Sequence, residues 1–268
     1  MGANTKQLRN RIKSVDSTLH LTKAMGLVAS SKIRRAMEAM NNGKKYESAV
    51  RRAIAPILNS PETKKSPYMT EKTSDRLCLI VIAGDRGLAG GYNANIFRAL
   101  REYSDYDIIP IGKKACERFK GELMTAEGFD YGQAKEIADK ICRDFTEGKY
   151  GRVAILCTRY VSMLSQETYT KQLFPLIPSE EEKSHGIIFE PDEMTVLNTM
   201  IPSYVAGILI SAVRESFACE LAARRCAMDS AGKNAQEMID RLGLEYNRAR
   251  QSAITQEITE IVAGSGTD

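Results

Sequence analysis

The sequence predicts a mixed fold of α/β structure plus long helices, in which the N- and C-terminal segments form an antiparallel two-helix coiled coil around an inserted α/β domain. Apolar residues recur at steps of three and four in both terminal segments, as they do along one side of a packed helix. The middle of the chain instead contains short apolar runs that alternate with helical patterns, which is typical of buried parallel strands. No proline follows Pro202, so an uninterrupted helix can end the chain.

The N-terminal segment, residues 1–58, is predicted to be one long coiled-coil helix. Pro56 marks its expected end, because proline removes a helical hydrogen bond. Residues 59–76 are rich in turn-forming and charged residues, which predicts a linker or mobile loop. The seam of the helix is expected to consist of Leu8, Ile12, Val15, Leu19, Thr22, Met25 and Val28.

The middle segment, residues 77–202, is predicted to be a Rossmann-like α/β domain. Strands that alternate with helices indicate a mostly parallel sheet covered on both faces. Strands are expected at residues 77–83, 107–112 and 152–158, edge strands at 168–176 and 186–189, a polar loop at 179–185, and helices at 93–103, 113–120 and 133–146.

The C-terminal segment, residues 203–268, is predicted to be the second coiled-coil helix. It runs antiparallel to the first if the two ends of the inserted domain lie close together, as domain termini often do. It is longer than the first helix by about ten residues, so its apolar tip is expected to project and to contact another molecule. Its seam is expected to consist of Met228, Ala231, Ala235, Met238, Leu242, Tyr246, Ala249 and Ala253.

Charge and cysteine content narrow the classes of function. Residues 1–52 carry twelve Lys/Arg and three Asp/Glu, a net +9, and the remainder carries 26 basic and 31 acidic residues, a net −5. A solvated helix face explains the basic segment, and a coiled-coil scaffold or nucleic-acid clamp is the alternative. No aromatic residue precedes Tyr46, which disfavours binding of single-stranded nucleic acid. Six scattered cysteines and two histidines predict no zinc site and no disulfide framework. No run approaches the ~18 apolar residues of a membrane span.

A glycine-rich segment at residues 83–93 is the best candidate for chemistry, because it follows an expected strand and precedes an expected helix. Its backbone N–H groups could approach a phosphate. It lacks the Gly-Lys-Ser/Thr of a P-loop and the spacing of a dinucleotide-binding motif. A tight structural turn is therefore favoured, and a nucleotide-binding protein that uses residues 84–93 is the alternative.

Three stretches, residues 12–35, 84–93 and 246–264, closely resemble the γ subunit of F-type ATP synthase, and the resemblance extends over essentially the whole chain. It implies a central rotor shaft whose tip lies in a ring of α and β subunits, and an α/β domain that contacts the ε subunit and the membrane ring of c subunits. Proton flow through the c ring would turn the shaft and drive ATP synthesis in β. The γ chain itself would have no active site, no cofactor and no nucleic-acid partner.

The resemblance also implies a peripheral position at a membrane and a set of contact residues. The cytoplasmic face of a bacterial plasma membrane is expected, because the polar residues 1–11 form no signal peptide. The expected contacts with the α/β ring are Met25, Arg224, Arg250, Gln251, Ile254 and Ile258, and the expected contact with ε and the c ring is Glu190.

Overall fold

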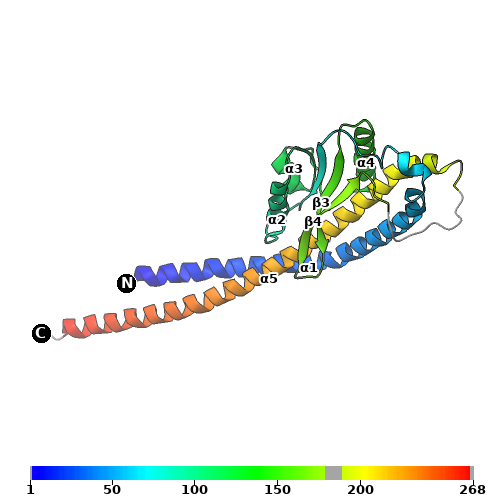
Figure 1. Cartoon of the computed structure of the whole chain (residues 1–268). Coiled ribbons are helices and arrows are strands. Elements are labelled where there is room, and N and C mark those ends of the chain that lie inside the picture. The colour runs from blue at the N-terminus through cyan, green and yellow to red at the C-terminus, as the bar shows by residue number, and fades with distance from the viewer. Residues whose placement is uncertain (1, 179–188, 266–268) are drawn as a thin grey trace. The chain divides into compact units, whose positions relative to one another are not determined.

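The computed structural model describes residues 2–178 and 189–265 (Figure 1). The chain forms two compact units, one of Met1–Ser30 and Arg225–Asp268 and the other of Ser31–Arg224. The division falls inside the two long helices, because both helices also bury apolar side chains in the larger unit. The boundaries at residues 58, 76 and 202 stay a prediction. These helices are α1 (Gly2–Leu58) and α5 (Glu193–Ser265).

The larger unit is built on a four-stranded sheet in the order β2-β1-β3-β4. β1 pairs in parallel with β2 and β3, whereas β4 pairs with β3 in the antiparallel sense. The predicted, mostly parallel sheet is confirmed. The expected polar loop at 179–185 lies outside the described residues, and so do residues 186–188 of the expected edge strand at 186–189. The last residue of that expected strand, Phe189, is described and is not in a strand. The strands are β1 (Leu77–Ile82), β2 (Tyr106–Ile111), β3 (Arg152–Tyr160) and β4 (Gln166–Phe174).

The helices of the inserted domain lie close to their expected positions. α4 starts at a capping box, in which the Asp130 carboxylate accepts the Gln133 N–H at 2.9 Å and the Gln133 side-chain oxygen accepts the Asp130 N–H at 3.2 Å. The first helix is shorter than expected, because the chain tightens into a 3₁₀ turn at Leu100. The elements are α2 (Tyr92–Ala99), η2 (Leu100–Glu102), α3 (Lys113–Phe119), α4 (Tyr131–Thr146) and the earlier 3₁₀ turn η1 (Glu62–Lys65).

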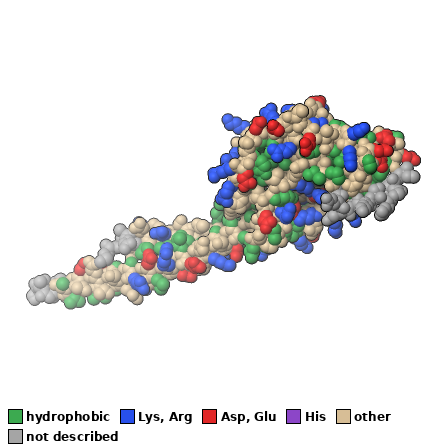
Figure 2. Space-filling view, in the orientation of Figure 1, with side chains coloured by type: hydrophobic (Ala, Val, Ile, Leu, Met, Phe, Trp, Pro, Cys, Tyr) green, Lys and Arg blue, Asp and Glu red, His purple; other side chains and the backbone are tan. Residues whose placement is uncertain are grey.

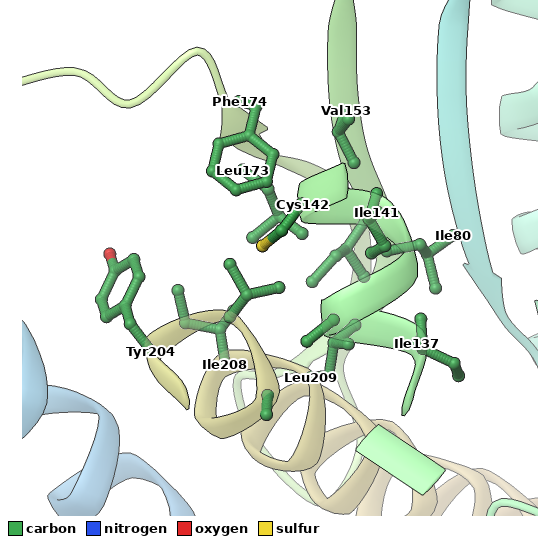
Figure 3. Close-up of a cluster of buried hydrophobic side chains, with 14 of the residues drawn as sticks. Ile80, Ile137, Ile141, Cys142, Val153, Leu173, Phe174, Tyr204, Ile208 and Leu209 are labelled. Carbon is green, nitrogen blue, oxygen red and sulfur yellow. The ribbon is translucent and has the colours of Figure 1, made fainter. Parts of the chain in front are cut away.

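Alternate residues of β1 supply two separate apolar clusters, one on each face of the sheet. Ile80 belongs to a large cluster with α4, α5 and the end of α1, whereas its neighbours Leu79 and Val81 belong to a second cluster with α2 and α3. Figure 3 shows Ile208 of α5 directed toward Cys142 of α4 inside the large cluster. The sheet is therefore covered on both faces, as predicted from its apolar strands.

The structure corrects the expected start of the second long helix. α5 begins at Glu193 and passes through Pro202, whereas the sequence indicated a start after that proline. A proline inside a helix costs about 3 kcal/mol. Leu197 and Ile201 are fully buried in this part of α5, and burial of such side chains contributes about 1.5–3 kcal/mol each. Burial of its apolar face therefore maintains the helix through the proline.

The segment at residues 59–76 is packed against the domain, so the expectation of a linker or mobile loop is wrong. Thr63 within η1 is fully buried. The Tyr68 carbonyl accepts the Leu176 N–H at 2.8 Å, and the Tyr68 ring stacks on Phe174 with centroids 5.4 Å apart. Turn-forming residues thus build a fixed connection, because an aromatic side chain anchors it in the core.

α5 contains a stretch that is long and apolar enough to cross a membrane, judged by length and composition alone. An 18-residue window of this helix has a mean hydropathy of 1.7, which corrects the expectation that no run approaches a span. However, 67% of that window is buried inside the protein. We therefore interpret the stretch as a core helix.

Candidate functional site: the helix pair and the glycine-rich loop

The smaller unit pairs the first part of α1 with the last part of α5. The two segments approach closely at glycine, since a Cβ atom on Gly26 would lie 3.6 Å from the Met228 Cβ. The predicted seam residues are buried or half-buried with one exception: Val28 is 53% exposed, whereas Ala29 is 1% exposed. A helix has 3.6 residues per turn, so after Met25 the inward position falls at 29 instead of 28.

A groove of about 390 Å³ lies along this helix pair. Gly26 and Gly232 are part of its lining, and a Cβ atom on either would be in van der Waals contact with the facing helix. Leu27 lines it and is 72% exposed, and Leu21 on the same helix is 59% exposed. Met25, a predicted contact residue, is half-buried beside them. Leu27 therefore adds an exposed apolar side chain to the lining of the groove.

The last turns of α5 carry four of the predicted contact residues on the surface. Arg250 and Gln251 are exposed, and Ile254 and Ile258 are 47% and 56% exposed. Residues 251, 254 and 258 follow at steps of three and four, so they lie along one side of the helix. Among the described residues, Arg250 has no ion-pair partner. A planar guanidinium beside apolar side chains can make charge-assisted hydrogen bonds to partner oxygens.

Arg224 differs from these residues because it is engaged within its own chain. Its residue is 6% exposed, and the guanidinium forms an ion pair with Glu220 one turn earlier in α5. It also donates hydrogen bonds to the carbonyls of Arg86 and Gly87, both at 3.3 Å. The predicted contact of Arg224 with a partner stays a prediction, and the structure gives this side chain an internal role.

The glycine-rich loop, residues 83–93, is held by the carboxylate of Glu220. The N–H groups of Asp85 and Arg86 donate to its two oxygens at 3.1 and 3.2 Å. Gly84 is needed next to it, because a Cβ atom there would lie 2.8 Å from the Glu220 Cδ. These are N–H groups of the kind that a phosphate would use, and an internal anion occupies them. The arrangement favours the structural turn over the nucleotide-binding alternative.

Asp85 ties the same loop to the rest of the domain. Its carboxylate accepts hydrogen bonds from three backbone N–H groups, those of Lys113 at 3.1 Å, Ala126 at 2.9 Å and Glu127 at 2.8 Å. The loop is thus bonded to α5 through one carboxylate and to α3 and the following segment through another. It joins α5 firmly to the edge of the sheet where β1 and β2 end.

Glu220 was not among the predicted site residues, although the sequence contains a signal for it. Glu220 and Arg224 stand four residues apart in a largely apolar stretch. Charged residues are rarely buried unless they are paired, and Glu220 is 1% exposed. Glu215, also buried, pairs with Lys44 of α1 at 2.7 Å. Buried glutamates within this apolar helix therefore mark where the helix binds the rest of the unit.

Glu190, the remaining predicted contact residue, is exposed just before α5 begins. Nearby, Asp192 caps the helix, since its carboxylate accepts the Thr195 N–H at 2.9 Å and the Thr195 hydroxyl at 2.7 Å. These hydrogen bonds favour the charged carboxylate and lower the pKa of Asp192. The structure leaves Glu190 accessible, and its contact with a partner stays a prediction.

Comparison with known proteins gives matches over nearly the full chain. A family model described as ATP synthase matches residues 4–267. The chain is similar to the ATP synthase gamma chain of Ruminococcus albus, with 41% identity over 99% of both chains, and to that of Desulforamulus reducens, with 37% identity over 98% of both. Among solved structures, it resembles a chain of the Euglena gracilis mitochondrial ATP synthase, with a TM-score of 0.66, 19% identity and coverage of 99% of this chain and 95% of that one. A chain of the Tetrahymena thermophila central stalk and c-ring structure gives a TM-score of 0.62 at 22% identity and covers 79% of this chain and 99% of that one.

Proposed function

Because the chain belongs to the ATP synthase family and matches its γ chains over nearly their whole length, we propose that it is the central rotor shaft of an F-type ATP synthase. In this role, proton flow through the c ring turns the shaft, and the turning shaft drives ATP synthesis in the β subunits. The γ chain is a non-catalytic component of that complex. Nucleotide chemistry belongs to its partners.

The observation that carries this proposal is the exposed surface on the last turns of α5. Arg250 and Gln251 are exposed there next to two half-exposed isoleucines, Ile254 and Ile258. In the proposed complex this surface contacts loops of the α/β ring, together with Met25 on α1. Charge-assisted hydrogen bonds are directional and can form again at each new position of a rotor. They suit a contact that must transmit force and then release.

A rotor must also pass torque between its α/β domain and its helices, and the larger unit is built for this. Glu220 accepts two N–H groups of the glycine-rich loop, and Arg224 donates to two of its carbonyls. α1 is bonded to α5 by the Lys44–Glu215 ion pair. Within the larger unit, sheet, loop and both helices therefore resist relative rotation. We assign this coupling role to Arg224, in addition to the ring contact expected of it.

The partners and the location follow from the same proposal. The helix pair would contact the α and β subunits, and the α/β domain, through Glu190, would contact ε and the c ring. The match to a central stalk and c-ring structure supports this assignment. The chain belongs to the membrane-associated catalytic sector, and a peripheral position on the cytoplasmic face of a bacterial plasma membrane is proposed.

The test replaces Arg250 and Gln251 together with alanine in the full chain. The complex is reconstituted with its partner subunits in vesicles, and ion-driven ATP synthesis per assembled complex is measured separately from assembly. We expect synthesis or assembly to fall. Arg241→Ala is the matched control, because this exposed arginine lies about half a turn around the helix from Arg250. Unchanged synthesis and assembly in the double variant would show that the two side chains are only a solvated helix face.

A further inference from the structure

An open hollow of about 520 Å³ lies on the face of the sheet that α2 and α3 cover. This volume falls within the range of small-ligand sites. It is formed where α2 passes into η2, at the start of β2 and at the C-terminal end of α3. Its lining combines arginine and aromatic side chains, namely Phe97, Arg98, Arg101, Tyr103, Tyr106, Arg118 and Phe119, with Ala94 and Leu100.

The hollow is strongly and uniformly basic. Arg98, Arg101 and Arg118 are all exposed, and no acidic residue lines the hollow with them. Within the described residues none of the three forms an ion pair, and Arg98 donates a hydrogen bond to the Asn95 amide oxygen at 3.2 Å. On the face of the domain seen in Figure 2, basic and acidic side chains are interspersed. Three uncompensated guanidinium groups around one hollow repel one another and attract an anion.

Aromatic rings hold one of these arginines in place. The guanidinium carbon of Arg118 lies 4.7 Å from the centroid of the Phe97 ring and 5.9 Å from that of Phe119. The two rings meet edge to face at 6.2 Å. Stacking of this kind limits the rotamers of the arginine, so less side-chain freedom is lost when it binds a ligand.

We propose that this hollow binds a phosphate-bearing ligand, whose oxygens accept hydrogen bonds from Arg98, Arg101 and Arg118. Guanidinium forks match phosphate oxygens in geometry and charge. Three cations around one small concave site suit a multiply charged group better than the single charge of a carboxylate. The ligand is either a soluble diphosphate or triphosphate or the headgroup of an anionic phospholipid. The proposal does not depend on the rotor function, because the hollow involves neither Glu220 nor the end of α5.

The first arm of the test measures binding of inorganic pyrophosphate to the full chain by isothermal titration calorimetry. Charge-assisted hydrogen bonds of this strength predict that each single alanine substitution of Arg98, Arg101 or Arg118 weakens binding about tenfold or more. Arg143→Ala is the matched control, since Arg143 is exposed on α4, which packs on the opposite face of the sheet. Circular dichroism and thermal unfolding of each variant verify that the fold is retained.

A second variant separates a built site from a general basic surface. Arg118→Lys keeps the charge but loses the planar stacked fork, so we expect it to weaken binding nearly as much as alanine does. Equal binding by wild type and Arg118→Lys would overturn the proposed geometry. The proposed site would be overturned if Arg143→Ala weakened pyrophosphate binding as much as the alanine substitutions in the hollow do. It would also be overturned if the wild-type chain bound neither pyrophosphate nor lipid.

The second arm distinguishes the two sources of phosphate. Vesicles that contain phosphatidic acid, whose phosphate monoester can carry two negative charges, and vesicles of phosphatidylcholine alone are compared by flotation with the full chain. If the chain binds only the phosphatidic acid vesicles, loses that binding in Arg101→Ala and shows no measurable pyrophosphate binding, the ligand is the lipid headgroup. Pyrophosphate binding without flotation assigns the soluble ligand. Binding of only an acidic peptide, with neither phosphate probe bound, would contradict the proposal.

Discussion

At the residue scale, Glu220 is the side chain on which the glycine-rich loop depends. It is 1% exposed, pairs with Arg224 and accepts two backbone N–H groups. Glu220→Gln keeps the size of the side chain but removes its charge. Because Arg224 is then left buried without its counter-ion, we expect the variant to lose about 3–5 kcal/mol of unfolding free energy. Urea unfolding of the full chain measures this loss.

The matched control for Glu220 is an exposed ion pair with the same helical spacing. Asp229 and Lys233 lie 3.0 Å apart, and their side chains are 68% and 72% exposed. Because solvent screens such pairs, Asp229→Asn should change the unfolding free energy by less than about 1 kcal/mol. If both variants changed stability equally little, the Glu220 carboxylate would not be holding the loop.

Buried thiols make the unfolding free energy of the larger unit depend on pH. Burial raises the pKa of Cys78 on β1 and of Cys142 on α4 to about 12, from an ordinary value near 9. A thiol whose pKa is higher in the folded state stabilises the fold below pH 9, and that contribution is lost as the pH rises toward 12. We expect each such thiol to reduce the unfolding free energy by up to about 1.4 kcal/mol per pH unit in this window.

Urea unfolding under reducing conditions at pH 8, 9, 10 and 11 measures this slope. Tyrosine and lysine side chains also titrate in this range, so the informative quantity is the difference between wild type and Cys142→Ala. The variant should be less stable at every pH, because a buried side chain is truncated, but its stability should fall less steeply above pH 9. Parallel curves for the two proteins would exclude a contribution from the Cys142 thiol.

At the element scale, the seam between the helices of the smaller unit supports its stability. Leu242 of α5 is 2% exposed, and Leu244 of the same helix is 62% exposed. Leu242→Asp places an unpaired charge in an apolar contact, so we expect it to cost about 3 kcal/mol or more. Leu244→Asp should stay within about 0.5 kcal/mol of wild type, because its side chain already faces solvent.

Backbone hydrogen exchange locates this effect in the chain. In Leu242→Asp, the amides of the smaller unit should exchange faster, because local opening there becomes easier. The larger unit does not contain Leu242 and should keep its protection. Equal protection of the smaller unit in wild type and in both variants would show that the seam contributes little to holding these segments together.

Elements whose signals are local could be predicted from the sequence, and those fixed by distant contacts could not. β1 can be predicted because Leu77–Ile82 is a continuous apolar run. The seam of α5 can be predicted from the spacing of its apolar residues. The start of α5 is not, because Pro202 suggests a boundary that core packing overrides. The sequence also does not predict that Glu220 holds the glycine-rich loop, because Asp85, whose N–H donates a hydrogen bond to Glu220, lies 135 residues earlier.

At the scale of the whole molecule, the contacts that join the glycine-rich loop to α5 differ in chemistry from the residues exposed on the last turns of α5. Inside the larger unit, buried ion pairs and backbone hydrogen bonds join the loop to α5, and such contacts are costly to break. On the last turns of α5, Arg250 and Gln251 are exposed beside half-exposed isoleucines. This contrast fits a larger unit that is firmly held together internally and a helix end that makes exchangeable contacts with its surroundings.

The apolar part of that exchangeable contact can be tested apart from its charged part. Ile254→Ser with Ile258→Ser removes two side chains that are about half exposed in the isolated chain. If the α/β ring covers them, each contributes on the order of 1 kcal/mol or more to association. Co-purification with α and β subunits at limiting concentration should then fall tenfold or more. Leu123→Ser, in the larger unit and 65% exposed in wild type, is the control and should assemble normally.

Normal assembly of the double serine variant, with loss of synthesis in the Arg250 and Gln251 variant, would place the contact in the polar side chains alone. Loss of assembly in the serine variant would mean that the isoleucines hold the shaft in the ring, while the arginine and glutamine determine how force is transmitted.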